Sequence, residues 1–323
     1  MKKIAVRVLG ILGGLLLLAV IGLVVKFFVL SPQVRPAPTV TAPKTPEAIA
    51  HGKYLVDHVA GCLGCHSPVQ DDKPGDYPVE GKLGAGRDFG AFPGSEMRFR
   101  SHNLTPDKET GIGDWTDGEV LRAMREGIGK DGHVLFPQMP YPVYARTLSD
   151  SDALDIIAYL RTIPPIKNDP GKTVVPFPVS MFIRAIPKPL EKSPPPPPPA
   201  TDKLARGRWL LQVASCHDCH DAYDDHHNPI PGKALGGGMK FPIPKGTAIA
   251  PNISSDKATG IGAYTDEDLA RVFNEGKGKS GRFLYVMPWS YYSGMTKEDK
   301  DALFAALRAE PAVSNLVPPS ELK

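Results

Sequence analysis

Two pentapeptides constrain this chain more than any other stretch: CLGCH at 62–66 and CHDCH at 216–220. Each pairs two thiols, three residues apart, with a histidine directly after the second. The chain has four cysteines, so the two motifs use every thiol and leave none for a disulfide. Thiols at this spacing can add across the vinyl groups of a haem, and the histidine can then bind the iron. We expect two covalently bound haem c groups, held by Cys62, Cys65, Cys216 and Cys219, with His66 and His220 as iron ligands.

Other interpretations of a CxxC pair are weaker in this context. A thioredoxin-like redox site opens a helix after a strand in a βαβ pattern, and a zinc site needs a second pair of soft ligands at matched spacing. Neither context accompanies Cys62 or Cys216. Each motif instead ends a helical pattern and is followed downstream by a Met-Pro pair. The chain has the attachment signature of a c-type cytochrome.

The sequence downstream of each motif occurs twice. Residues 103–165 and 252–311 share a stretch of the form N-x-[TS]-x-D-K-x-T-G-I-G, then a capped helix, a Gly-Lys turn, a Met-Pro pair and a last helix. The repeat predicts two cytochrome domains of the same kind, at 45–165 and 201–323. Each is long enough for a core of its own, of which a haem would fill much.

The iron needs a second axial ligand opposite each histidine. Methionine more often fills a core than binds a metal, so position has to decide. The repeats align Met287 with Met139, and Met/His ligation is common in cytochromes c. We therefore predict Met139 and Met287 as axial ligands. Four other methionines and seven other histidines find no like partner in this alignment, and we assign them no metal chemistry: Met97, Met124, Met239, Met295, His51, His58, His102, His133, His217, His226 and His227.

The first 30 residues have the pattern of a transmembrane anchor. Lysines and an arginine precede an uncharged run at 8–25, and apolar residues continue to Leu30, about 23 in all. This length suffices for a helix that crosses a bilayer, and the positive flank keeps the N-terminus in the cytoplasm. A cleaved signal peptide is the alternative, but no small-x-small site follows Leu30. Both interpretations deliver the haem domains to the periplasmic side of the cell membrane.

Two proline-rich segments flank the first domain. Residues 31–44 carry four prolines and predict an extended tether that holds this domain off the membrane. Residues 166–200 end in a run of prolines, which predicts a polyproline II spacer that keeps the two domains distinct. Within this linker, residues 173–190 mix aliphatic residues and prolines. They could cover the first domain, touch the membrane or pack on a partner.

Helix signals recur at matching places in both domains. Thr45 followed by Pro46 predicts a helix start, and Asp202 predicts another. Gly52 and its counterpart Gly207 would let another helix cross closely, the alternative being a glycine that is merely tolerated within its helix. Thr116 with Glu119 forms a capping box for a helix that stops at Gly127, and Ser149 with Asp152 opens the last helix. No strand pattern of any length is present, so we predict an all-α fold: two tandem class I cytochrome c domains behind the anchor.

The repeated motifs of the chain resemble those of a known family. The N-x-[TS]-x-D-K-x-T-G-I-G stretch, the Glu-Gly-x-Gly-Lys turn, the Met-Pro pair and the final helix are similar to those of cytochrome c subunits of membrane-bound alcohol, gluconate and aldehyde dehydrogenases. The resemblance covers both haem domains, from about Thr45 to Pro311, and extends to the VPFP segment of the linker. It implies class I cytochrome c folds and electron transfer from a dehydrogenase to quinone or a terminal oxidase.

The predicted function is outer-sphere electron transfer rather than catalysis. With iron ligated on both faces there is no open position for a substrate. Expected partners are a dehydrogenase, a quinol-oxidising complex or a terminal oxidase. The net charge of +3 is too small to favour nucleic acid. A dihaem peroxidase is the alternative, but it would need one iron able to open and two unlike domains.

Overall fold

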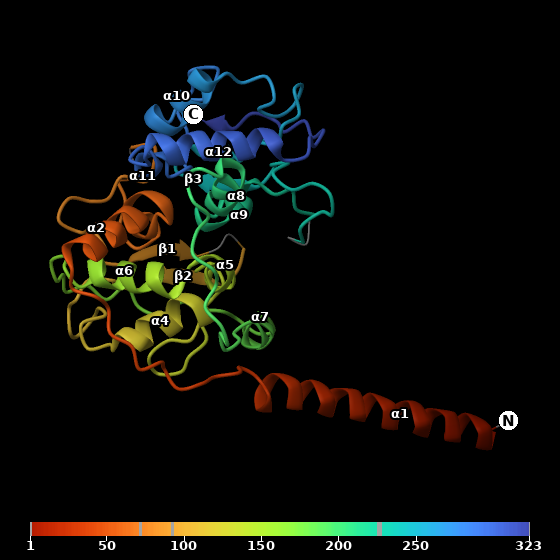
Figure 1. Cartoon of the computed structure of the whole chain (residues 1–323). Coiled ribbons are helices and arrows are strands. Elements are labelled where there is room, and N and C mark those ends of the chain that lie inside the picture. The colour runs from red at the N-terminus through yellow and green to blue at the C-terminus, as the bar shows by residue number, and fades with distance from the viewer. Residues whose placement is uncertain (1, 71–72, 92–93, 225–227, 323) are drawn as a thin grey trace.

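The computed structural model describes the chain except residues 1, 71–72, 92–93, 225–227 and 323. The pair His226-His227 therefore lies outside the described residues. Helix α1 (Lys2–Val24) continues as the π-helical turn η1 (Val25–Val29) and projects away from the folded part of the chain (Figure 1). Residues Val6–Val29 form one helix long and apolar enough to cross a membrane, and its apolar window is not buried in the protein. This fits the expected transmembrane segment.

The rest of the chain repeats one order of elements. The first half runs through α2 (Pro46–Tyr54), η2 (Leu55–Val59), α3 (Cys62–Cys65), β1 (Arg87–Ala91), β2 (Arg98–Ser101), α4 (Asp117–Glu126), α5 (Tyr141–Thr147) and α6 (Asp150–Leu160). After α7 (Val179–Phe182) and η3 (Ile183–Ala185), the second half follows with α8 (Lys203–Val213), α9 (Cys216–His220), β3 (Lys240–Ile243), β4 (Gly246–Ile249), α10 (Asp266–Glu275), α11 (Trp289–Tyr292), α12 (Lys297–Ala309) and β5 (Glu321–Leu322).

The fold is mostly helical but not all-α as expected. Strands β1 and β2 form an antiparallel pair, and β3, β4 and β5 form a small antiparallel sheet in that order. In the part of the chain that the structure describes, no strand exceeds five residues, and the register between β1 and β2 shifts near Gly90. Strands this short are too brief for an alternating hydrophobic pattern, which explains why the sequence did not indicate them.

The expected helix caps are present. The Thr45 side chain accepts a hydrogen bond from the amide of Ala48, and Thr116 and Glu119 form the complete capping box of α4. Helix α4 ends at Gly127, whose φ of +70° is left-handed. The ring of Tyr141 packs against this glycine, where a Cβ would come within 2.5 Å of it. Gly127 thus meets both a backbone and a packing requirement that a larger residue would not.

The first and last helices of each half cross at a glycine, as predicted. A Cβ at Gly52 would lie 1.8 Å from the Asp155 carbonyl oxygen of α6. A Cβ at Gly207 would lie 2.0 Å from the Ala302 carbonyl oxygen of α12. Backbone approach this close is open only to glycine. The two crossings are therefore equivalent, and each fixes the helix that leads into a CxxCH motif.

The halves differ in the turn before the motif. Gly52 precedes Cys62 by ten residues, whereas Gly207 precedes Cys216 by nine. The first half takes up its additional residue in the π-helical turn η2, while α8 is regular. A single inserted residue is the usual origin of such a turn. In this turn, His58 Nδ1 lies 2.9 Å from the Tyr291 carbonyl oxygen of the other half.

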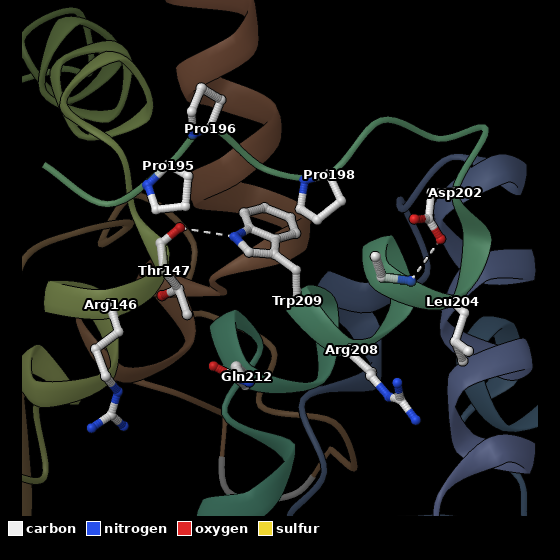
Figure 2. Close-up of a pocket in the computed structure, with 11 residues that line it drawn as sticks. Arg146, Thr147, Pro195, Pro196, Pro198, Asp202, Leu204, Arg208, Trp209 and Gln212 are labelled. Atoms are coloured by element: carbon white, nitrogen blue, oxygen red, sulfur yellow. Dashed lines mark hydrogen bonds between the residues drawn. The ribbon is translucent and has the colours of Figure 1, made fainter.

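The two halves pack directly on each other, contrary to the expected spacer role of the linker. One hydrophobic cluster includes buried residues of both halves. Trp209 of α8 donates from Nε1 to the Thr147 carbonyl at the end of α5, at 2.8 Å. The linker prolines lie over the same indole ring and line a shallow pocket between the halves (Figure 2). The polyproline run therefore lies on the joint because an aromatic face covers apolar pyrrolidine rings.

The segment 31–44 also differs from the expected free tether. Arg35 reaches Glu126 at the end of α4, with an Nη2 to Oε1 distance of 2.5 Å. The amide of Ala42 donates to Asp117 Oδ2 at 2.8 Å. Between them, the Pro38 carbonyl occupies the space that a Cβ on Gly118 would need. We call residues 35–42 the strap, because they run across α4 and join the anchor to the first half.

Candidate haem-binding sites

Each CxxCH motif begins where a left-handed residue ends the preceding helix. Gly61 has φ +59° before α3, and Ser215 has φ +55° before α9. The reversal starts a new short helix, which brings both cysteines of a motif to one side. Cys62 and Cys216 are half-buried, and both pack against the hydrophobic core. All four thiols are free, so both pairs are available for thioether formation.

The histidines of the two motifs are held in the same way. His66 Nδ1 lies 2.7 Å from the His102 carbonyl oxygen, and His220 Nδ1 lies 2.8 Å from the Pro251 carbonyl oxygen. A carbonyl can only accept, so Nδ1 carries the proton and Nε2 keeps a free lone pair. Burial lowers the pKa of His66 to about 4, and it lowers the pKa of His220 as well. Both imidazoles are therefore neutral near pH 7, as a metal ligand must be.

The two candidate methionines occupy equivalent places on the loops that enter α5 and α11. Met139 and Met287 are half-buried and pack against the core. The proline after each one caps the next helix with nearly identical dihedral angles, φ −78° and ψ 45° at Pro140, φ −79° and ψ 51° at Pro288. By contrast, Met124 and Met295 are buried in the core and have the ordinary role of fillers.

The cysteines do not have the properties of reactive thiols. Burial raises the pKa of Cys62 and of Cys216 to about 12. Burial, the Asp218 carboxylate and Cys65 of the other motif together raise the pKa of Cys219 to about 12. Thiol–disulfide exchange requires a lowered pKa, so these sites are unsuited to it.

The hydroxyl of Tyr141, near the loop that carries Met139, is buried without a hydrogen-bond partner among the described residues. Tyr141 opens α5 two residues after Met139. A buried hydroxyl without a partner costs about 1–3 kcal/mol. The first half therefore offers paired thiols, a neutral imidazole, a thioether and a buried hydroxyl without a hydrogen-bond partner in the part of the chain that the structure describes. This set of groups fits a haem c.

Two tyrosines of α11 lie between the motifs, and no sequence pattern singled them out. The Tyr291 ring packs on Gly64 within the first CxxCH, where a Cβ would approach it to 3.3 Å. The Tyr292 ring lies beside Gly61, and its hydroxyl donates to the Ala214 carbonyl at 2.8 Å. Ala214 lies two residues before Cys216. Tyr292 thus spans from one attachment segment to the other across the joint between the halves.

Comparison with known proteins supports an electron-transfer cytochrome c that binds haem covalently. The chain is 30% identical over 294 residues to the fructose dehydrogenase cytochrome subunit of Gluconobacter japonicus, covering 87% of this chain and 56% of that protein. It is 30% identical over 247 residues to the gluconate 2-dehydrogenase cytochrome c subunit of Pantoea cypripedii, covering 71% of this chain and 51% of that protein. A diheme cytochrome c-type protein of Cereibacter sphaeroides is 26% identical over 258 residues, 78% of this chain and 83% of that protein.

These relatives confirm the resemblance stated from the sequence. The first two, and an alcohol dehydrogenase (quinone) cytochrome c subunit of Gluconobacter oxydans that is 28% identical over 247 residues, are named as cytochrome subunits of dehydrogenases. This is consistent with an electron-transfer subunit rather than a catalytic one. The chain spans about half the length of the dehydrogenase subunits that it matches. A scan against protein-family models finds no match.

Proposed function

We propose that this chain is a membrane-anchored dihaem c-type cytochrome that carries electrons on the periplasmic face of the cell membrane. Its donor would be a dehydrogenase or a quinol-oxidising complex, and its acceptor a quinone or a terminal oxidase. One observation supports this most: the motif, the carbonyl-held histidine and the Met-Pro loop occur together twice, in the same geometry. Residues 45–165 and 201–323 would then be two class I cytochrome c domains.

The residues would divide the work in the same way in each half. Thioethers would fix each haem covalently, at Cys62 and Cys65 in one half and at Cys216 and Cys219 in the other. His66 and Met139 would hold one iron, and His220 and Met287 would hold the second. The haem iron, when bound, supplies the one-electron chemistry. The protein orients the ligands and excludes water, so its ligand set need not change when an electron arrives.

Removal of one thiol pair tests the haem assignment most directly. The Cys62→Ala/Cys65→Ala variant should carry one covalent haem in place of two, and Cys216→Ala/Cys219→Ala should lose the other. The measurement is haem per chain by alkaline pyridine spectra, together with intact mass. A wild-type chain without covalent haem would refute the proposal.

Spectroscopy tests the axial methionines. The oxidised wild type should show the methionine-to-iron charge-transfer band of a thioether ligand. The Met139→His and Met287→His variants should each lose about half of its intensity. Met124→Leu, which changes a core methionine, is the matched control and should leave the band unchanged. Rapid binding of carbon monoxide or turnover of hydrogen peroxide by the wild type would instead favour the peroxidase alternative.

The partner can be identified by gentle extraction. Three of the relatives are named as subunits of fructose, gluconate and alcohol dehydrogenases, which supports a dehydrogenase as the electron donor. Solubilised membranes would be run on a native gel stained for haem, and every polypeptide in the stained band identified. A flavin, quinoprotein or molybdenum subunit in the band would support the dehydrogenase. An oxidase or a quinol-oxidising complex would support a respiratory link.

A further inference from the structure

We propose that residues 174–186 lie in the interfacial region of the lipid bilayer, beside the outer end of the anchor. We call this segment, which includes α7 and η3, the foot. The inference rests on the proposed role of α1 as a retained anchor. It assigns a function to a linker segment whose sequence left three choices open.

The foot touches the apolar span itself. The rings of Phe27 and Phe182 make an edge-to-face contact, with centroids 5.3 Å apart at 87°. Phe27 belongs to the candidate span Val6–Val29, and at 6% exposure it is the buried residue of η1. Figure 1 shows α7 next to the end of α1 that leads into the folded part. Any bilayer that holds this span therefore reaches the foot.

An arginine of the foot closes the end of the anchor. Arg184 donates from Nε to the Phe27 carbonyl at 2.9 Å and from Nη2 to the Ser31 carbonyl at 2.8 Å. Its guanidinium also lies over the Phe28 ring, 5.9 Å from the centroid. A cation at a helix C-terminus is favourable because the free carbonyls there are partly negative. Arginine with its apolar stem in lipid and its charge at the headgroups is typical of the membrane interface.

The outer surface of the foot is apolar and exposed in the described part of the chain. Phe177 is 75% exposed and Phe182 is 52% exposed. Aromatic side chains with one apolar end in lipid are enriched at this depth of a bilayer. Further exposed aliphatic residues of the foot are Val174, Val179 and Ile186. Lys188 follows two residues after the foot and is exposed, as expected opposite anionic headgroups, while the exposed Lys192 further on stands beside the exposed Glu191.

The foot is also tied to the first half of the protein. Val174 pairs with Arg98 of β2 through two backbone hydrogen bonds, of 3.0 and 2.9 Å. Thr173 bonds the Arg100 amide and carbonyl through its hydroxyl, at 3.1 and 2.9 Å. The foot thus links the membrane surface to the sheet of the first half. Together with the strap, it would give this half two attachments to the anchor and a set orientation over the lipid.

Depth measurements on spin labels test the inference. Under the proposed function the four native thiols are thioethers, so a single added cysteine is labelled selectively. The full-length, haem-loaded variants Phe177→Cys, Val179→Cys, Leu17→Cys and Leu316→Cys would be placed in vesicles of phosphatidylcholine and phosphatidylglycerol. Leu17 lies within the span, and Leu316, at 84% exposure, is the matched exposed apolar residue of the second half. Electron paramagnetic resonance then compares collision with oxygen and with a water-soluble nickel complex.

Labels at 177 and 179 should favour oxygen over nickel several-fold relative to the label at 316. A lipid-like label at 17 with water-like labels at 177 and 179 would overturn the foot and leave the anchor intact. A water-like label at 17 would show that the anchor itself fails, and the foot with it. Labels at 177 and 179 shielded from both reagents would indicate a protein partner and would also overturn the proposal. Haem content, measured separately, reports on the cytochrome assignment.

Discussion

Helices α4 and α10 occupy the same place in the two halves, yet their outer faces have different surroundings. On α4 the strap runs across the surface, and Glu126 is buried beneath Arg35. On α10 the equivalent Glu275 is half exposed and pairs with Lys277 two residues later. Where the Pro38 carbonyl approaches α4 the residue is Gly118, whereas α10 has Glu267 at that position. The same helix is thus adapted to a covering segment in one half and to solvent in the other.

The comparison shows that the two halves differ at the surface of this helix while they keep the same helix ends. The caps of α4 and α10 are equivalent, since both have a full capping box and a left-handed glycine at the end. The differences at Gly118 and Glu126 lie where the strap crosses α4. The difference between α4 and α10 therefore follows from the strap, which lies outside the repeat, and the residues of α4 fit it by local substitution.

The largest expected loss of stability comes from substitutions at the two helix crossings, which are equivalent in the two halves. Gly52→Ala and Gly207→Ala each place a methyl group within 2.0 Å of a carbonyl oxygen. The backbones must separate, which should cost about 3 kcal/mol or more and lower Tm by roughly 6–12 °C. Because both halves share one core, each variant should still unfold in a single transition, measured by calorimetry and by circular dichroism.

Gly278→Ala is the matched control for these variants, because a Cβ there meets nothing closer than 3.8 Å. It should change Tm by no more than about 2 °C. Two separate transitions in Gly52→Ala or Gly207→Ala would contradict the shared core and favour independently folding halves.

The next largest effect is expected where the strap covers α4, compared with the exposed α10. Arg35→Ala leaves the Glu126 carboxylate buried without its partner, which should lower the free energy of unfolding by about 1–3 kcal/mol. Lys277→Ala removes the exposed partner of Glu275, the counterpart of Glu126, and should lower the free energy of unfolding by less than about 0.5 kcal/mol. Urea unfolding measures both. Limited proteolysis should also cut within residues 31–44 sooner in Arg35→Ala. Equal losses in the two variants would argue against a strap that covers α4.

The smallest expected effect concerns a hydrogen bond between the halves. Tyr54 donates from its hydroxyl to Asp299 Oδ2 at 2.6 Å. Burial, and then this bond, raises the pKa of Tyr54 to about 12. In the unfolded chain the phenol ionises near pH 10, so folding loses stability as the pH rises from about 10 to about 12. Tyr54→Phe should cost about 1 kcal/mol at pH 7.

The pH dependence separates this bond from mere packing. The difference in unfolding free energy between wild type and Tyr54→Phe should shrink as the pH rises from 10 to 12. Urea titrations at a series of pH values would measure it. A difference that stays constant over this range would show that the phenol proton has no part in joining the halves.

Much of the site was predictable because its signals are local. The CxxCH motifs, the Met-Pro pairs and the helix caps each occupy a few consecutive residues, and the repeat gave their correspondence. The glycine at each helix crossing was predictable for the same reason. Haem attachment and methionine ligation themselves stay predictions, which the variants above test.

The rest depends on contacts between distant segments. The carbonyls of His102 and Pro251 hold the two histidines, but a backbone acceptor has no signature in a sequence. The strap and the linker looked like free proline-rich spacers because composition reports stiffness and not what a segment lies against. Tyr292 resembles any core aromatic residue until the fold brings Ala214 to its hydroxyl.

The joint between the halves has a kinetic consequence. Trp209 bridges it with a hydrogen bond to Thr147, the Tyr292 ring lies beside Gly61 across it, and the polyproline run lies across its outer edge. With haems bound at the two motifs, the distance between them would be set by packing and not by the length of a linker. An electron could then pass from one half to the other without any swinging of domains, so thickening the solvent with glycerol should leave the rate of that step unchanged.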